Sequence, residues 1–209
     1  IISTPGGQTI LAAGQTVKLM DTATPGVKVE ITGTDTHATN LGQIMADAGT
    51  IGMAGALVRN SGTLDASSVV KEGGRIFLKA STVDLPGTLK ANGVTQGGSV
   101  SAQGDVIFQT GAIEANGNSG GDITLQANHI LQAGTLSAQG SGAQGGSISV
   151  AADSALIQTA FASIDVSGAT QGGSIALTTP NGLAFLSGTS QANGTQGGTI
   201  HVLAQDIMR

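Results

Sequence analysis

Apolar and polar residues alternate in short segments that recur along most of the chain. At 75–78, 122–125, 147–150, 174–177 and 199–202, the second and fourth residues are Ile, Leu or Val. Side chains of a β-strand point alternately to its two faces, so this pattern predicts strands with one buried face. The chain therefore consists largely of short strands that share a core.

A further apolar pattern occupies the later part of each repeat. It consists of pairs of apolar residues two positions apart: Leu64/Ala66, Leu89/Ala91, Ile113/Ala115, Leu136/Ala138 and Ile164/Val166. Stacked repeats would place these pairs in apolar columns, one step every ~4.8 Å. Between the two patterns, residues 155–157 form another short apolar segment in the best-preserved repeat. Each repeat is thus predicted to contain three short strands and three bends.

Pairs of consecutive glycines mark the repeat, at spacings of 24, 23, 25, 27 and 25 residues. A tight turn requires either positive φ or close approach of two backbones, and glycine permits both. We therefore interpret the pairs as structural turn positions: Gly73, Gly74, Gly97, Gly98, Gly120, Gly121, Gly145, Gly146, Gly172, Gly173, Gly197 and Gly198.

A regular repeat of this length predicts a solenoid. The expected fold is all-β, a right-handed parallel β-helix with about 25 residues and three short strands per coil. Residues 1–49 are expected to form N-terminal coils with a polar loop excursion near 33–40, and residues 50–209 to form regular repeats. Because a solenoid needs covered ends, we expect the chain to be a segment of a much longer one.

Two sets of polar residues recur beside the glycine pairs. One is Gln96, Gln144, Gln171 and Gln196, and the other is Asn92, Asn116 and Asn193. Stacked side-chain amides can hydrogen-bond from one coil to the next, which would give a polar ladder along a corner. The alternative is that these residues only form turns.

Composition limits both the core and the partners. The chain has no Trp, Tyr or Cys and only four Phe, so Ile, Leu, Val and Ala must fill the core, and disulfides and zinc–thiolate sites are excluded. Residues 91–208 contain six acidic residues and no Lys or Arg. That half cannot neutralise phosphates, which argues against nucleic acid and anionic membrane as partners. No apolar stretch reaches 18 residues, so no membrane insertion is expected.

The polar residues do not form a recognisable reaction centre. Carbohydrate-cleaving β-helices need acidic residues that converge on one face, whereas the candidates Asp84, Asp105, Asp153 and Asp165 occupy different positions within their repeats. His37, His129 and His201 lack the spacing of a metal site. We predict no catalytic, cofactor-binding or metal-binding residue, no cofactor and no enzymatic activity.

The N-terminal part resembles a known family. Residues 2–7, 11–17, 40–44, 49–52, 56–64 and 72–76 are similar to the filamentous haemagglutinin-like exoproteins of two-partner secretion. The similarity covers residues 1 to about 80, and beyond that only the Gly-Gly-x-Ile rhythm continues it. The family's Asn-Pro-Asn-Gly secretion motif is not matched, since residues 180–182 repeat only its last three letters.

The resemblance implies a secreted or surface-displayed adhesin on the outer surface of a Gram-negative bacterium. An outer-membrane barrel transporter would be its partner during secretion, and other parts of the chain would contact cell-surface or matrix glycans. With the family's secretion domain placed upstream, this chain would be a stalk segment that serves cell attachment or biofilm formation. The alternatives are a self-assembling fibre or sheath subunit and a polysaccharide-degrading β-helix enzyme.

Overall fold

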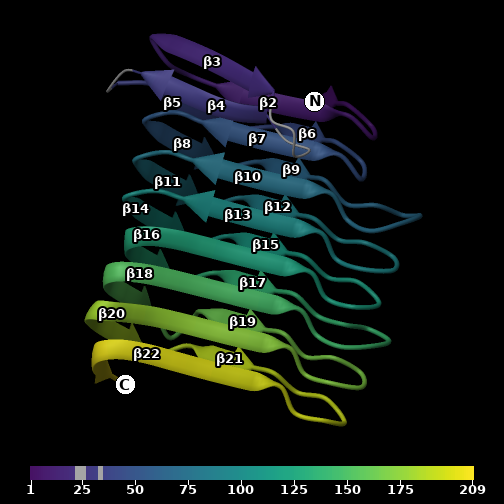
Figure 1. Ribbon diagram of the computed structural model, residues 1–209, viewed down its shortest axis with the longest axis vertical. Helices are drawn as coiled ribbons and strands as arrows, with labels where there is room; N and C mark the ends of the chain where they lie inside the picture. The colour runs from purple at the N-terminus through teal and green to yellow at the C-terminus, as the bar shows by residue number, and fades with distance from the viewer. Residues whose placement is uncertain (22–26, 33–34) are drawn as a thin grey trace.

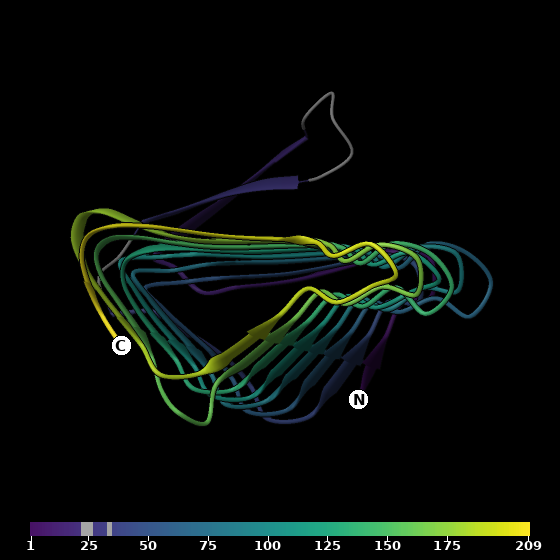
Figure 2. The same cartoon turned by 90° about the horizontal axis from the view of Figure 1, so that it is seen from below.

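The computed structural model describes residues 1–21, 27–32 and 35–209, and its described elements are all β-strands. The strands stack in successive coils from the N-terminus to the C-terminus (Figure 1). Viewed along this stack, each coil has three sides, and the chain winds as a right-handed parallel β-helix (Figure 2). The predicted fold class and the repeat of roughly 25 residues are confirmed.

The three sides are named here in chain order. The first face contains the strands β2 (Gln8–Ala12), β7 (Thr50–Ala54), β10 (Arg75–Lys79) and β13 (Ser99–Gln103). The second face contains β5 (His37–Asn40), β8 (Leu57–Asn60), β11 (Thr82–Leu85) and β14 (Val106–Gln109). The third face contains β1 (Ile2–Ser3), β6 (Gln43–Met45), β9 (Thr63–Asp65), β12 (Thr88–Lys90), β15 (Ala112–Glu114), β17 (Thr135–Ser137), β19 (Ser163–Asp165) and β21 (Thr189–Gln191).

In the C-terminal half, one long strand covers the first and second faces together. These strands are β16 (Asp122–Gln132), β18 (Ser147–Gln158), β20 (Ser174–Leu186) and β22 (Thr199–Met208). Their pairing shifts register where the faces meet, for example between Ala127 and His129. Such a bulge bends a strand without ending its ladder, so the chain still turns at this corner.

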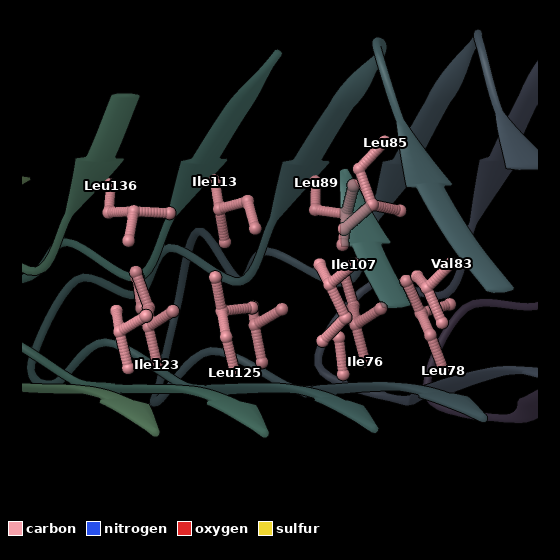
Figure 3. Packing of buried hydrophobic residues seen from close by; sticks show 14 of the residues in the cluster. Ile76, Leu78, Val83, Leu85, Leu89, Ile107, Ile113, Ile123, Leu125 and Leu136 are labelled. Carbon is pink, nitrogen blue, oxygen red and sulfur yellow. The ribbon is translucent and has the colours of Figure 1, made fainter. Parts of the chain in front are cut away.

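The core consists of the predicted apolar columns. On the third face, Ile44, Leu64, Leu89, Ile113, Leu136 and Ile164 follow one another in parallel register and are buried. Ile76, Ile123 and Leu125 of the first face pack opposite this column (Figure 3). Ile, Leu, Val and Ala fill the core as expected, with Met53 added, and none of the four Phe side chains is buried.

The N-terminal excursion is a hairpin inserted in the first coil between the first and second faces. Its antiparallel strands are β3 (Thr16–Asp21) and β4 (Val27–Thr32), and it stands away from the outline of the coils (Figure 2). Of the polar loop expected near 33–40, residues 33–34 lie outside the described residues, whereas His37–Asn40 forms β5 and pairs with β8. The division of the chain at residue 49 stays a prediction.

The glycine pairs lie where the third face turns into the first. Among the described residues, positive φ occurs only at Gly6 and Ala48, so no glycine of the pairs needs it. Glycine is needed at these pairs because the backbones of adjacent coils approach each other closely there. A Cβ atom at Gly121 would overlap the backbone of Gly97 and Gly98 in the preceding coil.

Candidate interaction surface

Three of the four candidate acidic residues engage local partners, and Asp153 lies at the same corner as Asp105, two coils further along the chain. Asp84 of the second face forms an ion pair with Arg59, at 3.2 Å between Oδ2 and Nη1. Asp105, at the corner before β14, accepts a hydrogen bond from Asn128. Asp165 of the third face accepts one from Gln139 and another from the backbone N–H of Ser167. The structure does not bring these carboxylates together as a general acid and base.

The histidines are also separated. His37 and His129 lie on the second face in different coils, and the exposed His201 lies on the first face. The described residues contain no group of three or more His, Cys, Asp or Glu side chains that could hold a metal ion. They also contain no helix of the length and apolarity needed to cross a membrane.

The recurrent glutamines stack through their backbones, not through their amides. Gln144, Gln171 and Gln196 follow one another in parallel bridges, and Gln96 bridges to Ser119. Their side chains are exposed, and no hydrogen bond joins two of these amides in the described part of the chain. For these residues, the interpretation as turn formers fits better than an amide ladder.

Asn92 and Asn116 link successive coils through their side chains, whereas Asn193 contacts the preceding coil through its backbone N–H. The Asn92 side-chain oxygen accepts the N–H of Asn116 at 2.8 Å, and that of Asn116 accepts the N–H of Gln139 at 2.7 Å. Asn92 also donates to Glu114 at 2.9 Å. These residues line an open hollow of about 590 Å³ beside the third face. The hydrogen bonds of Asn92 and Asn116 along this hollow join successive coils.

A buried amide column lies at the corner between the second and third faces. It contains Asn40, Asn60, Gln109, Gln132 and Gln158, and Leu85 and Leu186 occupy the same position in other coils. Several of these amides donate to the carbonyl of the corner glycine two residues later, as Gln109 does to Gly111 at 2.7 Å. This column was not predicted, although an amide two residues before a glycine recurs at the repeat period.

The column gives a prediction in which one substitution has opposite effects at two positions. Gln158 Nε2 is buried without a hydrogen-bond partner, which costs about 1–3 kcal/mol. Leucine already fits this column at Leu85. We expect Gln158→Leu to raise the free energy of unfolding by about 1 kcal/mol. Gln109→Leu should lower it by about 1 kcal/mol, because it removes the hydrogen bonds that Gln109 donates to Gly111 and accepts from Gln132. Urea denaturation measures the unfolding free energy of both variants. If both substitutions stabilised the protein, or both destabilised it, Gln158 and Gln109 would not differ in hydrogen bonding as described.

An exposed apolar row occupies the outer side of the second face. Phe108, Leu131, Ile157, Phe185 and Met208 follow one another in register on adjacent strands, and we call them the apolar stripe. Four of them are well exposed: Phe108 39%, Ile157 43%, Phe185 37% and Met208 53%. The sequence carried a signal for this row, since two adjacent apolar residues such as Leu156-Ile157 break the alternation of a half-buried strand.

Comparison with known proteins identifies a structural relative. The chain matches the crystal structure of the HMW1 secretion domain from Haemophilus influenzae, with a TM-score of 0.82 and 25% sequence identity over 96% of this chain. The chain spans 58% of the length of that structure. No protein-family model and no curated protein matches the chain.

This likeness confirms the resemblance to filamentous haemagglutinin-like exoproteins and supports an adhesin-related secreted protein. The relative is a secretion domain and not an enzyme. From the sequence we placed the secretion domain upstream of this chain. The match instead extends over 96% of the chain and 58% of that structure, so this chain has the fold of part of the secretion domain.

Proposed function

We propose that this chain directs the export of a large adhesin-related protein across the outer membrane of a Gram-negative bacterium, with a barrel transporter as its partner. The observation that carries the proposal is the likeness to a secretion domain over 96% of the chain. The exported protein would then serve in attachment or biofilm formation at the cell surface, as the sequence resemblance implies.

The composition of the chain supports a passenger of this kind. Having no cysteine, the chain cannot form a disulfide that would have to be broken before passage through a narrow pore. Its strands pair mainly with the neighbouring coil, which allows a solenoid to form one coil after another. Folding outside the cell could therefore proceed as the chain emerges, without distant segments having to meet first.

The proposal predicts that removing the transporter abolishes surface display. In a strain that lacks the cognate barrel transporter, antibody against this chain should no longer label intact cells, and the protein should remain in the periplasm. Restoring the transporter gene is the control, and attachment to a surface is measured on the same cells. Unchanged labelling without the transporter would contradict the export role. Lost labelling with unchanged attachment would contradict only the adhesive role.

A further inference from the structure

We propose that the apolar stripe is a docking surface for a protein partner whose contact surface combines apolar side chains with lysine or arginine. The stripe comprises Phe108, Leu131, Ile157, Phe185 and Met208, one residue from each of five successive coils. At one coil every ~4.8 Å it is roughly 20 Å long. The inference does not depend on the proposed export function.

The stripe residues lie on the outer side of their strands and are not part of the hydrophobic core. In the same strands, Ile107, Ile130, Leu156 and Ala184 point inward and are buried, so the core is filled without the stripe residues. The neighbouring row is mixed. It adds the apolar residues Val106, Ala155 and Leu183, of which Leu183 is 38% exposed, and it also contains His129 and Asp206. A contiguous row of exposed apolar residues is typical of an interaction site.

The stripe begins abruptly along its own row. In the preceding coils the equivalent outward positions hold Thr39, Arg59 and Asp84, and the last two form an ion pair. From Phe108 onward, every residue of the row is apolar. Two of the chain's four phenylalanines lie here, and aromatic residues with few charges characterise the centres of protein interfaces.

The acidic residues around the stripe indicate the kind of partner that would bind it. Residues 91–208 carry six acidic residues and no Lys or Arg. Asp105 and Asp153 stand at the corner that borders the stripe, and Asp206 lies on the neighbouring row at its end. A partner with cationic groups around an apolar centre would complement this surface. Nucleic acid and anionic lipid would be repelled.

The same charges disfavour a second copy of this chain as the occupant. A symmetric dimer through the stripe would place two acidic surfaces against each other, because a two-fold interface pairs each patch with itself. Residues 91–208 have no lysine or arginine to compensate for that repulsion, and only Arg209, directly after Met208, adds a positive charge at one end of the stripe. The expected partner of the stripe is therefore a different protein with basic residues at its contact surface.

The test uses the whole chain and two labelled ten-residue peptides, one alternating valine with lysine and the other alternating valine with glutamate. Fluorescence anisotropy at low salt should show binding of the lysine peptide alone, weakened at least tenfold in the double variant Phe108→Ser, Phe185→Ser. Phe161→Ser is the matched control, since this phenylalanine is 90% exposed on a corner loop outside the stripe. It should bind like the wild type. Circular dichroism shows whether each variant keeps the fold.

Several results would overturn the proposal. They are absent binding of the lysine peptide, equal binding of the two peptides, and unchanged binding by the double variant. Sedimentation tests the second-copy alternative: a wild-type dimer that the double variant dissolves would assign the stripe to self-association instead. Binding to neutral phospholipid vesicles, lost in the double variant, would assign it to a lipid surface.

Discussion

The Gly145→Ala variant is expected to lose about 3 kcal/mol of unfolding free energy or more, a large effect for a single methyl group. A Cβ atom at this position would overlap the carbonyl oxygen of Val166 and lie 2.7 Å from the backbone nitrogen of Gly173. Both atoms belong to the following coil, and Gly173 N–H donates to Val166 at 2.7 Å. The methyl group therefore cannot be accommodated without displacing a hydrogen-bonded backbone.

Gln144→Ala is the control within the same turn. Gln144 directly precedes Gly145, and its side chain is exposed. Its stability should remain within about 0.5 kcal/mol of the wild type, because substitution of an exposed side chain has little effect on the folded state.

Thermal unfolding followed by circular dichroism measures the difference between these two variants. For a chain of this size, the midpoint of Gly145→Ala should lie roughly 10 °C below that of Gln144→Ala. Midpoints that agree within about 2 °C would show that the glycine pairs are not required by close approach of the coils.

The sequence predicted those parts of the structure that repeat. Leu89, Ile113 and Leu136 occur at the same place in successive repeats, and a parallel solenoid must stack them, so their column followed from spacing alone. The glycine pairs were located in the same way. The sequence left two explanations for why these positions are glycine, namely positive φ or close approach of two backbones. Only the geometry of neighbouring coils distinguishes them.

The features that the sequence analysis missed depend on which residues become neighbours across coils. Gln109 and Gln132 were not considered because each looks like an ordinary polar residue beside a turn. They become one buried column only when the register brings them together. The apolar stripe has the same origin, since Phe108 and Phe185 are 77 positions apart in the chain but belong to one row of paired strands.

The Ile113→Asp variant should be the other strongly destabilised one. Ile113 is buried in the third-face column between Leu89 and Leu136, without a polar partner in that column (Figure 3). An unpaired carboxylate at such a place costs several kcal/mol, and it is expected to prevent stable folding at neutral pH. Ala112→Asp is the control, because residue 112 points outward on the same strand and should tolerate the charge.

The pH dependence separates the effect of the charge from that of the lost side chain. Burial disfavours the carboxylate, so the pKa of the carboxyl group introduced by Ile113→Asp would be raised in the folded variant above its unfolded value of about 3.9. The penalty from the charge is then absent below about pH 4 and grows as the pH rises toward the folded pKa. Ile113→Ala, which only leaves a cavity, should lose about 2–5 kcal/mol at every pH. Urea denaturation should therefore give Ile113→Asp a stability closer to that of Ile113→Ala at pH 4, whereas at pH 7 Ile113→Asp should show little or no folded protein even without urea. If the unfolding free energy of Ile113→Asp relative to Ile113→Ala were the same at both pH values, solvent would reach residue 113, because only a hydrated carboxylate keeps its ordinary pKa.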